Sequence, residues 1–374
     1  MIRLSVCLLA AFSLSLGCAG SGRKAAAPAP TLTRTVHLEG VGAPRWDVGV
    51  PGRLDHFAYD PATHRLFVAA LENGSLEVLD LETGQRVKSI GGLQHPQGIA
   101  TARSIGCAVL ACEDGSVHVY DTRSLDEKKT ITLGQGADNV RYDAEADAIY
   151  ITYGTVEGGA IAVFNPRTWE KLREIHYKCR PESFQLDPRG TRVFANLPGG
   201  TRATQDGVVA VADRTTGKTK AEIALKGRAR NFPMAFDAAH ERLFVVTRRP
   251  AKLIAIDTRS NAVLTEADCA EDSDDLFYDA TSDHVLVIGG GFRPDMQDVP
   301  VTTGVATSQG ARRDETGAID VFAVGEGGEL TRVSVTGTAP HARTGLFVPE
   351  RRALYIAVPP LEGRTPEVRE YKLD

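Results

Sequence analysis

The stretch GSLEVLD (74–80) recurs in altered form six more times along the chain. The other copies are GSVHVYD (115–121), GAIAVFN (159–165), GVVAVAD (207–213), AKLIAID (251–257), GAIDVFA (317–323) and PEVREYK (366–372). Successive copies begin 41, 44, 48, 44, 66 and 49 residues apart, and this is the spacing of four-stranded blades in a β-propeller. The sequence therefore predicts an all-β chain that folds as a seven-bladed β-propeller of four-stranded antiparallel blades.

Every repeat unit contains the pattern of four strands. Each copy is itself a strand, because apolar residues alternate along it after a small or turn-forming residue. Short apolar runs precede the copies and predict buried second strands: RLFVA (65–69), CAVLA (107–111), AIYIT (148–152), RVFAN (192–196), RLFVV (242–246), HVLVI (284–288) and ALYIA (353–357). The predicted inner strands come earlier still, beginning at His56, Gln97, Asn139, Ser183, Pro233, Asp275 and Gly345. More polar segments such as ETGQRVKSI (82–90) follow the copies and predict outer strands.

The last unit predicts how the ring closes. It reaches Asp374 directly after its third strand, so its fourth strand has to come from elsewhere. The segment LTRTVHLEG (32–40) precedes the first unit and has the character of an outer strand. We expect it to complete the last blade, because this pairing leaves no open sheet edge. Residues 32–374 are thus predicted to form a single propeller.

Composition and charge exclude one class of function. The chain has 374 residues, 42% of them hydrophobic, and a formal net charge of −5. A nucleic-acid surface needs clustered Lys and Arg with interleaved aromatic residues, and no such cluster occurs. We therefore expect no nucleic-acid partner.

The first residues resemble an export signal. Residues 1–17 contain Arg3 followed by the apolar run LSVCLLAAFSLSL (4–16), which is too short for a permanent membrane span. The sequence LSLGC (14–18) resembles a bacterial lipobox, and this predicts lipid attachment at Cys18. Ala19 after that cysteine favours the outer membrane by the same resemblance. Residues 18–31 are rich in small residues and Pro, so we expect a flexible tether in the periplasm or cell envelope.

The remaining cysteines have no spacing typical of a zinc or redox motif. Cys107 and Cys112 bracket one strand, so their Cα atoms would lie roughly 16 Å apart, too far for a disulfide. Cys179 and Cys269 both precede inner strands, in units four and six, and a bridge between them stays open.

The repeats resemble the YncE-like, YVTN-type family of bacterial seven-bladed propellers. The resemblance covers nearly all of residues 32–374 and rests on units such as GRLDHFAYDPATHRLFVAALENGSLEVLDLETGQ (52–85). It also rests on ADNVRYD (137–143), RPESFQLD (180–187), DSDDLFYD (272–279) and ARTGLFVPE (342–350). The resemblance implies an extracytoplasmic propeller and does not imply a reaction.

The residues that enter the inner strands should converge at the mouth of the central channel. That predicted ring is polar and acidic, and it contains Asp55, His56, His95, Gln97, Asp138, Asn139, Glu182, Asn231, Asp274, Asp275 and Arg343. Three interpretations are open: a hydrated channel, a structural divalent cation such as Ca²⁺, or a ligand or catalytic site. The candidate metal ligands are Asp138, Asn139, Glu182, Asn231 and Asp275.

Several loops are expected at the same mouth. The 66-residue interval places an insertion at 291–317, between the second and third strands of unit six, where it would overhang the ring as a lid. The loop at 197–207 and the turn at 248–250 should flank it. Loop arginines there are either solvated or available to an anionic ligand. The acidic segment DCAEDSDD (268–275) lacks the Gly and Glu positions of an EF-hand and predicts a solvated rim.

Two functions from different classes follow. No nucleophile elbow, zinc helix, P-loop or dinucleotide fingerprint occurs, and this favours a non-enzymatic binding or scaffold module of the bacterial envelope. It would use the loop-rich face for a protein, a polymer or a small ligand. We expect a monomer that meets the membrane only through its lipid anchor. The alternative is a metal-dependent hydrolase that resembles propeller lactonases, with the ring carboxylates holding a metal that polarises a carbonyl or water.

Overall fold

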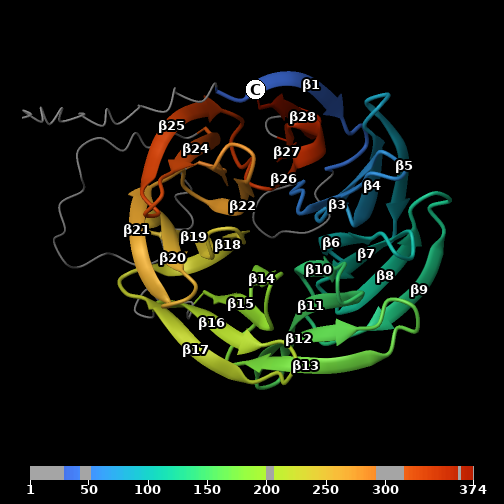
Figure 1. The fold of residues 1–374 in the computed structure, drawn as a ribbon. Coiled ribbons are helices and arrows are strands. Elements are labelled where there is room, and N and C mark those ends of the chain that lie inside the picture. Colours follow the sequence, from blue (N-terminus) through green and yellow to red (C-terminus); the bar gives the residue numbers. More distant parts are fainter. Residues whose placement is uncertain (1–28, 43–51, 199–205, 292–315, 361–363, 374) are drawn as a thin grey trace, which may run out of the picture.

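Seven four-stranded sheets form a closed ring around a central channel (Figure 1). This computed structural model describes residues 29–42, 52–198, 206–291, 316–360 and 364–373. Within each sheet all neighbouring strands are antiparallel, and the first strand in each blade lies at the channel. The predicted seven-bladed β-propeller is confirmed.

The strands follow the predicted order, from the channel outward, in every blade. The first four blades are β2 (Phe57–Asp60), β3 (Arg65–Ala70), β4 (Ser75–Asp80), β5 (Gln85–Gly91); β6 (Pro96–Ala102), β7 (Cys107–Cys112), β8 (Ser116–Asp121), β9 (Glu127–Thr132); β10 (Val140–Asp143), β11 (Ala148–Thr155), β12 (Gly158–Phe164), β13 (Lys171–Tyr177); and β14 (Phe184–Leu186), β15 (Arg192–Leu197), β16 (Gly207–Asp213), β17 (Thr219–Leu225). The last three are β18 (Ala229–Asp237), β19 (Arg242–Arg249), β20 (Ala251–Asp257), β21 (Ala262–Asp268); β22 (Ser273–Asp279), β23 (His284–Gly289), β24 (Ala318–Val324), β25 (Leu330–Gly337); and β26 (Gly345–Val348), β27 (Ala353–Val358), β28 (Glu367–Lys372), β1 (Thr31–His37). A short 3₁₀ turn, η2 (Pro349–Arg351), follows β26.

The N-terminal strand closes the ring. Strand β1 pairs antiparallel with β28, with Leu32 opposite Tyr371 and Val36 opposite Val368. In Figure 1 the blue β1 lies on the outer side of the red β28. The last blade therefore combines both ends of the described chain, as the sequence predicted, and its outer strand is not left without a partner.

The apolar core lies between neighbouring blades. Successive side chains of a strand point to opposite faces of its sheet. On β3, Leu66 and Val68 pack with Tyr355 of the last blade, whereas Phe67 packs with Leu110 of the second blade. Both faces of the second strands are thus buried, and this explains why these segments are continuously apolar.

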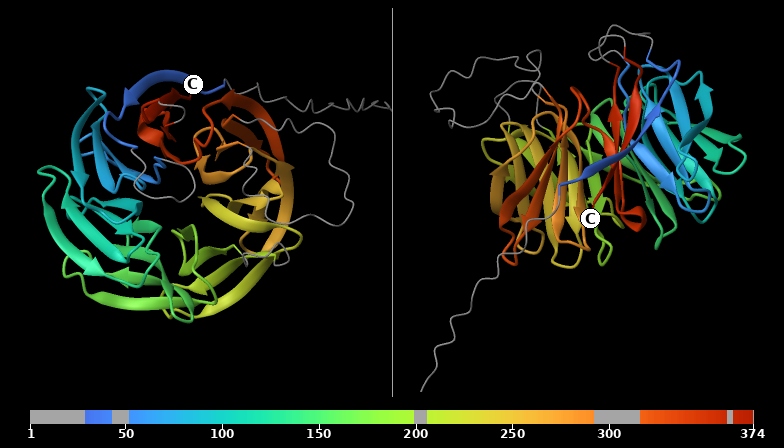
Figure 2. Two further views of the ribbon diagram at one scale, coloured as in Figure 1. Left: turned by 180° about the vertical axis from the view of Figure 1, so that it is seen from behind. Right: turned by 90° about the horizontal axis from the view of Figure 1, so that it is seen from above.

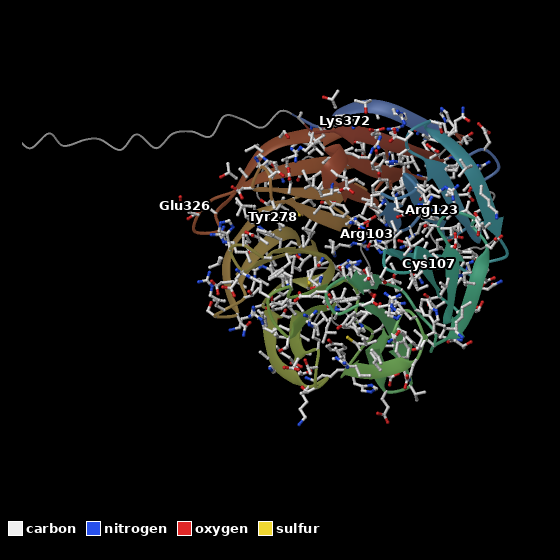
Figure 3. All side chains as sticks on the ribbon, turned by 45° about the vertical axis from the view of Figure 1, so that its right-hand side comes forward. Arg103, Cys107, Arg123, Tyr278, Glu326 and Lys372 are labelled. Carbon is white, nitrogen blue, oxygen red and sulfur yellow. The ribbon has the colours of Figure 1, made fainter. Side chains whose placement is uncertain are left out.

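The last residue of the repeated stretch has a structural role. In the first five copies it is Asp80, Asp121, Asn165, Asp213 and Asp257, and each side chain accepts hydrogen bonds from the backbone N–H groups two and three residues later at 2.8–3.1 Å. Asp and Asn favour such turns. This position of the repeat therefore stabilises the turn into the outer strand and is not part of a site. Side chains project from the whole periphery of the ring, with Glu326 at its edge (Figure 3).

The insertion of the sixth blade begins and ends at the channel mouth. The N–H of Gly290 donates to the carbonyl of Asp272 (3.2 Å), and the N–H of Gly317 donates to that of Ala339 (3.1 Å). Both carbonyls belong to segments that lead into inner strands. The connection from β23 to β24 therefore lies on the face of the ring that carries the channel mouth, as expected. The right-hand panel of Figure 2 shows the ring from its edge. Residues 292–315, which carry the predicted lid, and 199–205 lie outside the described residues.

Two further predictions concern the whole chain. Cys107, Cys112, Cys179 and Cys269 all carry free thiols, so Cys179 and Cys269 are not bridged. Within the described ranges, no helix has the length and apolar character to cross a membrane. The predicted signal peptide and lipidated Cys18 precede the first described residue, and both stay predictions.

Candidate functional site

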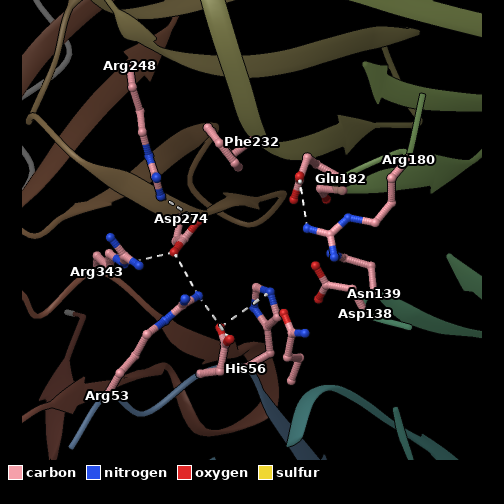
Figure 4. A pocket seen from close by; sticks show the side chains of 13 residues that line it. Arg53, His56, Asp138, Asn139, Arg180, Glu182, Phe232, Arg248, Asp274 and Arg343 are labelled. Carbon is pink, nitrogen blue, oxygen red and sulfur yellow. Dashed lines mark hydrogen bonds and ion pairs between the residues drawn. The ribbon is translucent and has the colours of Figure 1, made fainter. Parts of the chain in front are cut away.

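A cavity of about 130 Å³ lies at the channel mouth. All seven blades contribute to it, through residues that lead into inner strands and through the end of β19. The lining is Arg53, Asp55, His56, Gln97, Asp138, Asn139, Arg180, Glu182, Ser183, Phe232, Arg248, Asp274 and Arg343 (Figure 4). Charged and amide side chains dominate this set, so the cavity is suited to a polar ligand.

The cavity brings together most of the predicted ring but not three of its members. His95, Asn231 and Asp275 are absent from the lining. Asn231 is fully buried, and its side-chain amide donates to Asn196 Oδ1 (2.9 Å) and to the carbonyl of Val208 (3.0 Å). Asp275 Oδ2 accepts from the N–H of Gly345 (2.9 Å) and lies 3.2 Å from His56 Nδ1.

All three exceptions occur in blades with a register shift, although Gln97, Phe232 and Asp274 lie within the same shifts and line the cavity. The pairing of inner and second strands shifts between Pro96 and Ile99, between Asn231 and Met234, and between Ser273 and Asp275. The other four blades have no such irregularity in this pairing. A bulge adds a residue on one strand and redirects the neighbouring side chains. The misplaced residues therefore belong to the three blades whose inner strands begin with a bulge.

Three arginines converge on Asp274 on one side of the cavity. Arg248 Nη2 lies 2.5 Å from Asp274 Oδ1, and Arg343 Nε lies 2.8 Å from Asp274 Oδ2. Arg53 Nη2 is 3.7 Å from the same Oδ2. Burial alone would raise the pKa of Asp274, but the three guanidinium groups outweigh it and hold that pKa well below its usual range.

Asp272 shares two of these arginines. Arg343 Nη1 donates to both of its carboxylate oxygens at 2.9 and 3.1 Å, and Arg248 Nη1 lies 3.4 Å from Oδ1. The guanidinium carbon of Arg248 also lies 4.1 Å from the ring centre of Phe232, a cation–π contact. The side chains of Arg248 and Arg343 are only 8% exposed.

These contacts correct two expectations. The acidic segment is a solvated rim only in part: Asp268 and Glu271 are exposed, whereas Asp272 is 7% exposed and the Asp274 side chain 11%. Arg343 and Arg248 are not solvated loop residues either, since both are buried in ion pairs. An unpaired buried charge is very costly, so the acidic segment and the arginines neutralise each other.

His56 connects the arginine side to the channel. Its Nδ1 lies 3.2 Å from Asp275 Oδ2 and its Nε2 lies 3.8 Å from Asp55 Oδ1. Burial lowers the pKa of His56, but the carboxylates of Asp275, Asp55 and Asp138 outweigh that effect and raise the pKa to about 10. His56 is therefore an imidazolium at neutral pH.

The opposite side of the cavity carries more acid than base. Arg180 Nη2 lies 3.5 Å from Glu182 Oε1, and Nη1 lies 3.4 Å from Glu113 Oε2. Asp138 is 5% exposed, and its Oδ1 is buried with no hydrogen-bond partner among the described residues. Burial and the charge of Glu182 raise the pKa of Asp138 to about 7, although His56 and Arg180 act to lower it. Burial also raises the pKa of Glu182.

The predicted metal ligands do not form one cluster. Asn231 and Asp275 make the contacts given above, away from the cavity that Asp138, Asn139 and Glu182 line. Across the part of the chain that the structure describes, no three His, Cys, Asp or Glu side chains come together in a way that could hold a metal ion. The cation that the sequence offered as one interpretation thus gains no support from this geometry.

A wider part of the channel, about 480 Å³, continues from the cavity between the inner strands. His56, Asn139 and Ser183 line both spaces. The wider part is more apolar and is lined by aromatic side chains including Tyr142, Phe236, Tyr278 and Phe347. The polar cavity is therefore the narrow entrance of a longer channel.

Sequence reasoning missed Arg53, Phe232 and Asp272, and it did not place Arg180 and Arg248 in the ring. A period-two signal was present for three of them. Arg53, Arg180 and Asp272 each stand two residues before a ring member, namely Asp55, Glu182 and Asp274. In extended chain, residues two apart point to the same side. No comparable signal marks Phe232.

Comparison with known proteins shows the fold alone. No family model and no curated protein matches the sequence. A chain of the Kuenenia stuttgartiensis hydrazine synthase structure is similar with a TM-score of 0.66 at 14% identity, over 86% of this chain and 96% of that one. A chain of a mitotic checkpoint complex is similar with a TM-score of 0.68 at 12% identity, over 98% of this chain and 99% of that one. At such low identity these similarities show a β-propeller and no more specific relationship.

Proposed function

We propose that this chain is a non-enzymatic binding module of the bacterial envelope that takes a small polar ligand at its channel mouth. Propellers in general present binding surfaces on a rigid ring, and the fold fits that role. Among the partners considered from the sequence, a small ligand suits a cavity of about 130 Å³ better than a polymer or a protein. A cavity of similar size in another protein holds one benzene molecule.

One observation carries the proposal. Oδ1 of Asp138 and Oδ1 of Asp55 are both buried in the cavity wall without a hydrogen-bond partner among the described residues. Buried polar groups are nearly always hydrogen-bonded, because leaving one unpaired costs about 1–3 kcal/mol. Asp274 Oδ2, Arg53 Nε and Arg248 Nη2 in the same wall also make no hydrogen bond to a described residue, although each of these groups takes part in an ion pair. A cavity wall with several such atoms indicates that a polar ligand supplies the missing partners.

The proposal includes membership of the YncE-like, YVTN-type propellers and an extracytoplasmic location. Support comes from the repeats quoted above and from the lipobox-like LSLGC (14–18). Lipid attachment at Cys18 would tether the propeller to the outer membrane. Fractionating a bacterium that expresses the chain, with wild type beside Cys18→Ser, tests this part. We expect palmitate labelling and membrane association for wild type and neither for the variant. Cytoplasmic wild-type protein would contradict the assignment.

Binding at the mouth is tested with a library of small polar compounds and thermal melting. We expect compounds that raise the melting temperature of wild type but not of Asp55→Asn. Arg103→Ala is the control, since Arg103 is exposed and lines the wider channel rather than the cavity. Compounds that stabilise wild type and Asp55→Asn equally would refute binding at this cavity. Substrate turnover that depends on Asp55 would refute the non-enzymatic role.

A further inference from the structure

We propose that the ligand of the mouth cavity is a small organic ammonium ion held by Asp138, Asp55 and Glu182. This inference rests on the proposed binding function and specifies the chemistry of its ligand. It follows from how the charges divide across the cavity, from the two unpartnered oxygens and from the size of the space.

The charges are balanced on one side of the cavity only. The arginine side has Arg53, Arg248 and Arg343 against the carboxylates of Asp55, Asp272 and Asp274. His56 pairs with Asp275. Across the cavity Arg180 is the one cation within 4 Å of Glu182 and Glu113 among the described residues, and Asp138 has no ion pair there. Figure 4 shows Asp138 and Glu182 beside Arg180 and away from Arg248. Even with Arg141, whose charge acts on Asp138 from beyond 4 Å, this side holds the three carboxylates of Asp138, Glu182 and Glu113 against two guanidinium groups. It therefore lacks one positive charge.

The unpartnered oxygens require a donor. Asp55 is 1% exposed; its Oδ2 accepts from Arg53 Nη2 at 2.9 Å, while its Oδ1 is left without a hydrogen bond. Asp138 Oδ1 also has no hydrogen-bond partner among the described residues, and Asp138 is 5% exposed. An ammonium group has three N–H donors and no acceptor, and its charge matches the deficit. A neutral hydroxyl would supply one donor and leave the charge uncompensated.

An anion fits less well. The guanidinium groups of Arg248 and Arg343 already contact Asp272 and Asp274 at 2.5–3.4 Å. An anionic ligand would have to displace these buried carboxylates and leave them unpaired. The donors that make no hydrogen bond, Arg53 Nε and Arg248 Nη2, belong to guanidinium groups that are already in ion pairs, whereas Asp138 has none among the described residues. The uncompensated carboxylate thus favours a cation.

The cavity limits the size of that cation. A volume of about 130 Å³ is slightly below the 150 Å³ that accommodates benzene, a molecule of six non-hydrogen atoms. Alkylammonium ions of about five or six non-hydrogen atoms therefore fit. We take n-butylammonium and 1,4-diaminobutane as probes, with n-butanol and butyrate as neutral and anionic counterparts of similar shape.

The experiment is isothermal titration of the purified full chain with these four compounds and with CaCl₂ at pH 8. We expect binding of the two amines and no binding of butanol or butyrate. Asp138→Asn keeps the shape but loses the charge, and it should weaken amine binding by about 10- to 100-fold, the effect of one charge-assisted hydrogen bond. Asp143→Asn is the matched control, because it makes the same substitution at the far end of β10, the strand that Asp138 leads into.

A second measurement does not depend on binding. Asp138→Asn should melt at a higher temperature than ligand-free wild type at pH 8, because it removes a buried carboxylate that has no partner. Asp143→Asn should melt lower, since Asp143 forms an ion pair with Arg214 and accepts from the turn at Glu145 and Ala146. A purely structural Asp138 would instead lower the melting temperature when replaced.

The outcomes separate the two proposals. Amine binding that Asp138→Asn weakens and Asp143→Asn does not supports the inference. Binding of butyrate, butanol or Ca²⁺ in place of the amines, abolished by Asp55→Asn, overturns the ammonium ligand but leaves the binding function standing. Amine binding that is equal in wild type and Asp138→Asn also overturns the inference.

Discussion

His56 makes the stability of this propeller depend on pH in the alkaline range. The substitution that exposes this effect is His56→Gln, which keeps a polar side chain but cannot carry a proton. In the native protein the imidazolium lies between Asp275 and Asp55, at 3.2 and 3.8 Å. These carboxylates raise its pKa to about 10, against an ordinary value of about 6.5.

The sign and size of the effect follow from linkage. Between pH 6.5 and 10 the native protein holds one proton on His56 that the unfolded chain has lost. Stability from this group is therefore fully present below pH 6.5 and is lost as the pH rises toward 10, by about 1.4 kcal/mol per pH unit. From pH 7 to pH 9 the free energy of unfolding of wild type should fall by about 2–3 kcal/mol relative to His56→Gln.

Urea unfolding at pH 7, 8 and 9 measures this difference. The control is His176→Gln, because the His176 side chain is 67% exposed and far from the cavity lining, and its curve should parallel wild type. Parallel pH curves for wild type and His56→Gln would show that His56 is neutral in the native protein. An imidazole NMR titration of His56 with a midpoint between 6 and 7 would refute the reasoning independently.

Three further predictions test the buried network, the ring closure and the metal interpretation. Arg343→Ala should reduce the free energy of unfolding by about 3–5 kcal/mol, because it leaves Asp272 and Asp274 buried with one partner fewer, whereas Arg103→Ala should change it by less than about 0.5 kcal/mol in urea unfolding. Deleting residues 31–37 removes the strand paired with β28; we expect a lower melting temperature and concentration-dependent association by light scattering, and an unchanged monomer would contradict the closure. Chelator should leave the melting temperature of the purified protein unchanged, since Asn231 and Asp275 contact other protein groups; a large fall in chelator, reversed by Ca²⁺, would revive the metal-dependent hydrolase.

Much of the fold could be predicted because the repeat fixes the register of each blade. The stretch at 74–80 and its copies became β4, β8, β12, β16, β20, β24 and β28, and the apolar runs before them became the second strands. These positions depend on local patterns of period two. The closing strand was also predictable, because a missing fourth strand and a spare outer strand complement each other.

The site was only partly predictable, because the direction of a side chain at a strand end depends on the pairing of that end. Asp55, Asp138 and Glu182 enter regular inner strands and line the cavity as expected. Asn231 lies directly before a register shift and Asp275 directly after one, and no residue pattern in their blades announces the shift. The buried ion pairs were missed for a related reason: sequence alone assigns arginines near loops to solvent, and only the convergence of the blades brings Arg248 and Arg343 to Asp274.

Two buried carboxylates at this mouth, those of Asp274 and Asp138, differ in the charges that surround them. Where a carboxylate stabilises the ring, as Asp274 does, its pKa is held low by arginines within 4 Å. Asp138 sits equally deep, but its pKa is raised to about 7 and it has no ion pair among the described residues. A neutral residue at position 138 would avoid this cost of burial. The inferred cationic ligand would offset the cost by supplying the missing charge and hydrogen-bond donors when it binds.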